Sequence, residues 1–100
     1  MTIKNDPQAE TLEGLLFSEA CSFYGIDPTQ LISTKRGYYS KARRAIALVL
    51  VTQGKWSERS VAKLFHVHHS AVQESLAHAK DLIRTDPLFL EIVERLGKLL

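Results

Sequence analysis

The sequence predicts an all-α domain, a compact bundle of about six helices containing a helix-turn-helix. Apolar residues recur at spacings of three and four along most of the chain, and no segment alternates apolar and polar residues as a strand would. Asp-Pro, which combines an N-cap with a first-turn residue, occurs three times. The chain has 100 residues, of which 45% are hydrophobic. We therefore expect residues 1 to 100 to form one compact domain with a modest core.

The first half of the chain is expected to hold two long helices with a short one between them. The first helix starts at Asp6-Pro7 and stops at Gly25, and the second Asp-Pro starts a short helix that carries Leu31 and Ile32. The segment STKRGYYS is expected to be a basic loop. Ser40 can then cap a third helix over residues 41 to 53, which is apolar around much of its circumference and should be the most buried one.

The second half is expected to hold three helices. Gly54 ends the third helix, and Ser57 with Glu58 opens a short fourth one. The fifth helix covers residues 70 to 84, with a single buried stripe. The last Asp-Pro opens a closing helix within residues 86 to 100, whose apolar stripe should complete the core. The expected inward residues of these helices are Val61, Ala62, Leu64, Phe65, Val72, Leu76, Ala79, Ile83, Leu88, Leu90, Ile92, Val93, Leu96 and Leu99.

Positive charge is concentrated in the middle of the chain. Residues 1 to 27 contain one basic and five acidic residues, and residues 58 to 100 contain six of each. Residues 28 to 57 contain no acidic residue, which points to a polyanionic partner; the alternative is a solvated basic face without a partner. The basic residues of this segment are Lys35, Arg36, Lys41, Arg43, Arg44 and Lys55.

The sequence gives no sign of a membrane segment or a disulfide. The longest apolar run, AIALVLV, is far shorter than a bilayer span, and MTIKNDPQAE has no signal-peptide apolar region. We therefore expect a cytoplasmic protein. The single Cys21 cannot form an internal disulfide or anchor a cysteine-based zinc site, and it is expected to be a buried thiol.

The segment FHVHHSAV raises the question of a metal or catalytic site, because it holds His66, His68 and His69. Zinc would need further ligands, and no carboxylate or cysteine supports these histidines at a workable spacing. The nearest acids, Glu58 and Glu74, have no recognisable catalytic spacing, and no phosphate-binding loop or nucleophile motif occurs. We therefore expect no metal, no cofactor and no enzymatic activity.

The same segment fits the turn of a helix-turn-helix. A short helix, a turn of three or four residues and a longer helix place the start of the second helix in the DNA major groove. Ala62 lies where the two helices must approach closely, and Phe65, Val67 and Val72 are expected to pack inward. The side chains left outward can bond base edges or phosphates, although Ser70 could also only cap the helix. These outward residues are His68, His69, Ser70 and Gln73.

Three stretches resemble the C-terminal DNA-binding domain of the bacterial replication initiator DnaA, over residues 19 to 84. EACSFYGIDPTQLIS is similar to the family's opening helix. LISTKRGYYSKARRAIALVL aligns without a gap to its basic loop and the helix that follows. WSERSVAKLFHVHHSAVQESL takes the place of its helix-turn-helix signature. The resemblance implies the fold of that domain and binding to double-stranded DNA.

The resemblance also implies roles for single residues. Arg36 and Lys35 would enter the minor groove, and His69 and Ser70 match a His-Thr pair that contacts the major groove. Arg43, Arg44 and Lys55 would lie at phosphates. The family string Gly-Gly-Arg-Asp-His-Thr-Thr is one residue longer, however, and here Val67, His68 and Ala71 replace its Arg, its Asp and its second Thr. Replacing an Asp that binds cytosine by His changes the preferred base.

We therefore expect a free-standing double-stranded DNA-binding module with a regulatory or replication-accessory role. It shows no nucleotide-binding loop, so no ATP binding is expected. The alternative is a protein-interaction module that retains the fold and has lost DNA reading. The acidic N-terminal segment or the last helix would then serve a protein partner.

Overall fold

The computed structural model describes residues 11–34 and 37–100 and confirms the all-α fold class. Within these ranges the chain forms five α-helices and one 3₁₀ helix, and no strand. None of these helices is long and apolar enough to cross a membrane. The elements are α2 (Leu12–Tyr24), η2 (Pro28–Gln30), α3 (Gly37–Thr52), α4 (Glu58–Phe65), α5 (His69–Thr85) and α6 (Pro87–Gly97).

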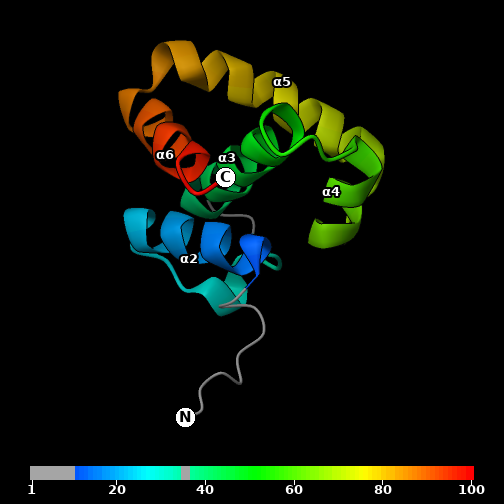
Figure 1. Ribbon diagram of the computed structural model, residues 1–100, viewed down its shortest axis with the longest axis horizontal. Coiled ribbons are helices and arrows are strands. Elements are labelled where there is room, and N and C mark those ends of the chain that lie inside the picture. The colour runs from blue at the N-terminus through cyan, green and yellow to red at the C-terminus, as the bar shows by residue number, and fades with distance from the viewer. Residues whose placement is uncertain (1–10, 35–36) are drawn as a thin grey trace.

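The most buried helix is α3, as its apolar circumference predicts. Figure 1 shows it at the centre of the bundle, with α2 below it, α5 above it, α6 on one side and α4 at the far end. Small and branched side chains on α3 let the neighbouring helices approach closely. Every residue from Ala45 to Leu50 is buried, as is Ala42.

Both ends of α2 are set by residues next to them in the sequence. The Thr11 hydroxyl accepts a hydrogen bond from the Gly14 amide at 3.0 Å, so Thr11 is the N-cap of the described helix. The predicted start at Asp6-Pro7 lies outside the described residues. Gly25 ends α2 with φ 65°, as expected.

The single cysteine lies on the inner side of α2. Cys21 is buried, as predicted, and burial raises the pKa of its thiol, which keeps it protonated and unreactive.

The short second helix is a single 3₁₀ turn, shorter than predicted. The Asp27 carboxylate accepts from the Thr29 amide at 3.0 Å, which confirms Asp27 as its N-cap. Leu31 is fully buried just after this turn. The helix ends at Gln30, so the prediction that Leu31 and Ile32 lie on it was wrong, and Ile32 is 40% exposed. One turn can direct only one of two adjacent side chains into the core.

The third helix starts earlier than predicted, at Gly37, so Ser40 lies inside α3 and is not its N-cap. Tertiary contacts explain this difference. The Tyr38 ring stacks on Tyr24 with centroids 5.6 Å apart. The Tyr39 hydroxyl accepts a hydrogen bond from the Asp27 amide at 3.2 Å. These contacts hold the first turn of α3 against α2 and the chain beyond it.

Gly54 follows the end of α3, but for a different reason than predicted. The left-handed residue of this connection is Lys55, with φ 63°, and not the glycine. A Cβ on residue 54 would lie 2.8 Å from the Leu50 carbonyl oxygen. Glycine is therefore required by the close approach of two backbone segments. The Trp56 amide completes the turn by donating to the same Leu50 carbonyl at 2.9 Å.

The closing helix packs on the core through a stripe that differs partly from the predicted one. Ile92, Val93 and Leu96 are buried as expected. Phe89, which the predicted stripe omitted, is fully buried. The prediction was wrong for Leu88, Leu90 and Leu99, which are exposed. Residues next to a buried one on a helix point about 100° away from it, so adjacent apolar residues cannot all face the core.

Asp86 joins the start of α6 to α3. Its carboxylate accepts from the amides of Leu88 and Phe89 at 3.1 and 3.2 Å. The Lys41 ammonium group donates to the same carboxylate at 2.7 Å. This Lys41 hydrogen bond, followed by the backbone hydrogen bonds, holds the pKa of Asp86 below its usual value.

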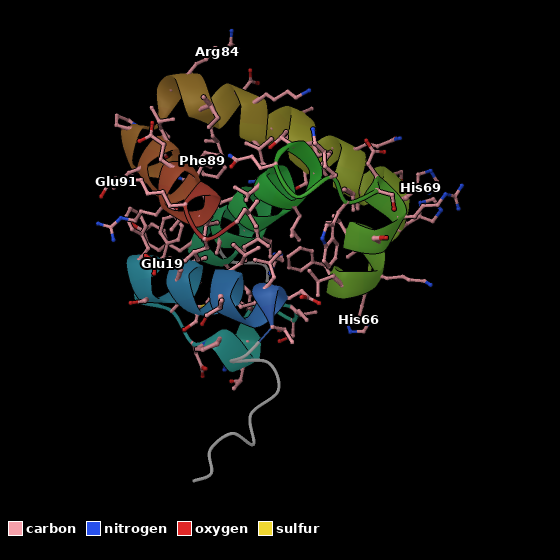
Figure 2. All side chains as sticks on the ribbon, in the orientation of Figure 1. Glu19, His66, His69, Arg84, Phe89 and Glu91 are labelled. Carbon is pink, nitrogen blue, oxygen red and sulfur yellow. The ribbon has the colours of Figure 1, made fainter. Side chains whose placement is uncertain are left out.

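Arg95 of α6 joins this helix to α2. It forms ion pairs with Glu91 of its own helix and with Glu19 of α2, and Figure 2 shows the two glutamates on these neighbouring helices.

Replacing Asp86 tests this arrangement. Asp86→Ala is expected to lower the free energy of unfolding by about 1–2 kcal/mol, because the N-cap and the Lys41 partner are lost together. Asp86→Asn keeps a capping oxygen and should lose less. Because the pKa is lowered in the folded state, the charge contributes above the unfolded pKa of about 4 and is lost as the pH falls through the folded value. Urea unfolding should therefore show the full wild-type advantage over Asp86→Asn at pH 7 and a progressive decline as the pH falls below about 4 toward the folded pKa; an advantage that does not decline would contradict this role.

Candidate nucleic-acid interface

The short helix α4, a three-residue turn and α5 form a helix-turn-helix. The chain leaves α4 at Phe65, turns through residues 66 to 68, and enters α5 at His69. His66 has φ 57° in the left-handed region, and the Val67 amide donates to the Ala62 carbonyl at 3.0 Å. Ala62 is buried at this close approach, as expected. The motif is thus a tight corner between two packed helices.

The inner side of this corner is filled by fewer residues than predicted. Phe65 and Val72 are buried, and the Phe65 ring stacks on Phe17 of α2 with centroids 5.7 Å apart. Val67 is 44% exposed, so its predicted inward packing was wrong. Val67 lies in the turn after the left-handed residue His66, and it lines an open groove together with Phe65 and Val72.

His68 is the N-cap of α5. Its Nδ1 accepts from the Ser70 amide at 3.2 Å and lies 2.9 Å from the Ser70 hydroxyl oxygen. Capping by Nδ1 requires that this nitrogen carries no proton, so the ring is held as the tautomer with its proton on Nε2. Ser70 is therefore not the cap, which answers the alternative left open by the sequence. The His69 ring lies beside His68, with centroids 4.6 Å apart.

Gln73 is exposed on the second turn of α5, but its amide is oriented by α4. Its Nε2 donates to the Glu58 carboxylate at 3.1 Å. Glu58 is the first residue of α4, after the N-cap Ser57. Gln73 thus keeps its predicted place at the front of α5, together with His69 and Ser70. Its hydrogen bond with Glu58 was not predicted from the sequence.

One face of α4 is basic, which was not predicted from the sequence. We name Arg59, Lys63 and His66 the α4 basic face; all three are exposed. Their spacings of four and three place them on one side of the helix, which was a usable signal. With His68 and His69 they line a shallow depression that contains no acidic residue. In Figure 2 the labelled His66 and His69 project from the α4 end of the molecule, away from the bundle. Among the described residues, none of the three forms an ion pair.

A second groove, of about 270 Å³, lies between α3, α4 and α5, and its lining includes Arg43 and Arg44. These adjacent arginines differ in their hydrogen bonds. Arg43 donates to the carbonyls of Leu31 and Thr34, the latter at 2.6 Å. Burial, with the neighbouring Arg44 charge, lowers the pKa of Arg43. Arg44 has no such bond within the described residues. Arg43 is therefore committed to the fold, and Arg44 is the arginine available to a ligand.

The other predicted basic residues are dispersed. Lys41 is held by Asp86, beyond the opposite end of α5 from His69. The 17 residues of α5 separate these ends by about 25 Å. Lys55 is exposed in the turn before α4. Lys35 and Arg36, the predicted minor-groove residues, lie outside the described residues.

Substituting each of the adjacent arginines separates their roles. Arg43→Ala is expected to lower the free energy of unfolding by about 1–3 kcal/mol, because two carbonyls lose a charged donor. Arg44→Ala should change it by less than about 0.5 kcal/mol. Urea unfolding of both variants measures the difference. Equal losses of stability in the two variants would contradict the conclusion that only Arg43 is committed to the fold.

His68 can be tested as a cap by two substitutions. His68→Ala is expected to lower the free energy of unfolding by about 0.5–1 kcal/mol, whereas His68→Asp should match or exceed the wild type, because a carboxylate caps well and favours a helix N-terminus. His78→Ala, on the exposed surface of the same helix, is the control and should be nearly neutral. Thermal melts followed by circular dichroism measure all three. A His68→Ala variant as stable as His78→Ala would exclude the cap.

Within residues 11–34 and 37–100, no group of three or more His, Cys, Asp or Glu residues is placed to hold a metal ion. Comparison of the chain with protein-family models, curated proteins and solved structures finds no match. A function for this surface is therefore inferred from its own shape, charges and hydrogen bonds.

Proposed function

We propose that this chain binds double-stranded DNA, with the start of α5 in the major groove. The observation that carries the proposal is the polar front of α5 beside the α4 basic face, which lines a depression without an acidic residue. A helix-turn-helix contacts bases through the first residues of its second helix, while its first helix crosses the backbone. Both requirements coincide at one end of the molecule.

The base-contacting residues of this proposal are His69, Ser70 and Gln73. They occupy positions one, two and five of α5, which face one side of the helix. A ring nitrogen, a hydroxyl and an amide can each bond base edges. His68 keeps its Nδ1 for the cap, so only its Nε2–H remains to donate to DNA.

The phosphate-contacting residues lie on both sides of this front. The α4 basic face supplies Arg59, Lys63 and His66 on one flank, and Arg44 lies on the other. Backbone contacts of this kind position a protein on the duplex and supply most non-specific affinity. Lys55 precedes α4 and can extend the first flank. By the resemblance to DnaA, Lys35 and Arg36 would add a minor-groove contact.

The same resemblance suggests the wider role. A DNA-binding domain similar to that of the replication initiator suits a regulatory or replication-accessory function at the bacterial nucleoid. His68 stands where the initiator family has an acidic residue, so its target sequence should differ from that of the family.

A protein-interaction function is the second candidate, and one observation favours it. Leu88 is 58% exposed on α6, and Leu90 and Leu99 are exposed on the same closing segment. Exposed leucines of this kind can contact a partner protein. These leucines belong to α6 and the residues that follow it, and not to α4 or α5.

Binding to duplex DNA as a function of salt tests the proposal. The logarithm of the association constant should fall linearly with the logarithm of the salt concentration, with a slope of about −0.9 per phosphate contact. Arg59→Ala and Lys63→Ala should each reduce the steepness of that slope by about 0.9, because each removes one contact. Fluorescence anisotropy with a labelled random duplex gives both quantities.

Arg84→Ala is the matched control, because it removes the same charge from the same motif. Arg84 is exposed, pairs with Asp81 of its own helix, and projects from the end of α5 opposite His69 (Figure 2). Its slope should equal that of the wild type. A wild type that binds no duplex even at low salt would refute DNA binding and favour the protein-interaction candidate.

A further inference from the structure

The hydrogen bond between Glu58 and Gln73 links the two helices of the motif at the surface proposed to face DNA. It joins the first residue of α4 to the fifth residue of α5, with 3.1 Å between the carboxylate oxygen and the amide nitrogen. Glu58 is half-buried and Gln73 is exposed. We infer that Glu58 is a positioning residue that sets the base preference of Gln73 in favour of adenine over guanine. This inference rests on the proposed function.

A carboxylate controls the orientation of an amide because it can only accept hydrogen bonds. The NH₂ group of Gln73 must therefore face Glu58, and its carbonyl oxygen must point away. Without this partner the side-chain amide could rotate by 180° and exchange its donor and acceptor. Glu58 itself is well placed at the first position of α4, where the positive end of the helix dipole favours an acid.

The oriented amide has two groups left for a base. One N–H bonds Glu58, so the second N–H and the carbonyl oxygen remain. An adjacent donor and acceptor match the N7 acceptor and N6 amino group of adenine in the major groove. Guanine presents two acceptors, N7 and O6, and its O6 would face the amide carbonyl without a proton between them. The orientation imposed by Glu58 thus favours adenine and penalises guanine.

The remaining described contacts around Glu58 support a role in orientation. Arg59 and Lys63 form no ion pair with it among the described residues, so Gln73 is its described side-chain partner. Glu58 also adds a negative charge to a surface proposed to face phosphates, which lowers overall affinity for DNA. An acid at this position is therefore useful for discrimination between bases and not for affinity.

Selection of bound sequences from a random duplex pool tests the inference. The wild type is expected to select an A·T pair at one position of its site. Glu58→Gln keeps the size of the side chain but can both donate and accept, so Gln73 loses its fixed orientation. At that position the preference for adenine over guanine should fall by about 5- to 10-fold, in line with the discrimination of one bidentate contact. Preferences at other positions should not change.

Gln73→Ala should remove the preference at the same position, and the double variant Glu58→Gln with Gln73→Ala should behave like Gln73→Ala alone. Glu74→Gln is the matched control, because it removes the same charge from the neighbouring residue and should raise affinity for all duplexes alike. Circular dichroism melts check that each variant folds.

The outcomes separate this inference from the proposed function. If the wild type binds no duplex, DNA binding itself is refuted and the inference with it. If the wild type selects a sequence and Glu58→Gln leaves the preference for adenine intact, only the inference is overturned. The same holds if Glu58→Gln and Glu74→Gln change base preferences to the same extent.

Discussion

The apolar circumference of α3 is the constraint on which the other helices depend. A helix with buried residues at almost every position from Ala42 to Leu50 must be covered on all sides. The remaining helices have one apolar stripe each, and they supply this cover by turning that stripe inward. Their polar faces consequently point to solvent. The position of the helix-turn-helix follows, because α5 covers α3 from above and α4 lies at its far end, which leaves the corner between them outside.

Positive charge serves two different purposes in this structure. Lys41 and Arg43 are used internally, since one binds the capping carboxylate of Asp86 and the other binds backbone carbonyls of the preceding loop. Arg59 and Lys63 have no such partner among the described residues. The number of charges along the sequence does not distinguish these four cations from one another. Only the fold distinguishes the cations that stabilise it from those that remain available to a polyanion.

The sequence was sufficient where structure depends on near neighbours. The caps at Asp27, Ser57 and Asp86 were predicted because each side chain bonds amides within three residues. The start of α3 was not, because Tyr38 and Tyr39 are held by residues from α2 and the following turn. Contacts with residues this distant in the sequence cannot be predicted from the residues around the start of the helix.

The site shows the same division. The corner between α4 and α5 could be found from helical spacing, whereas the cap at His68 and the bond between Glu58 and Gln73 could not. Histidine is not among the common capping residues, and a contact across fifteen positions has no local signal. The α4 basic face was overlooked for another reason. The acids and bases of residues 58 to 100 cancel in number, although they lie on different surfaces.

The left-handed backbone at His66 has a consequence for how this motif can evolve. A residue with a Cβ at φ 57° costs about 1–2 kcal/mol compared with right-handed backbone, and glycine would avoid that penalty. The chain instead carries an imidazole there, beside the cations of α4. Selection for a more stable corner and selection for a more basic surface therefore act in opposite directions at this one position. Glycine at position 66 would therefore strengthen the corner at the expense of one basic side chain of the α4 basic face.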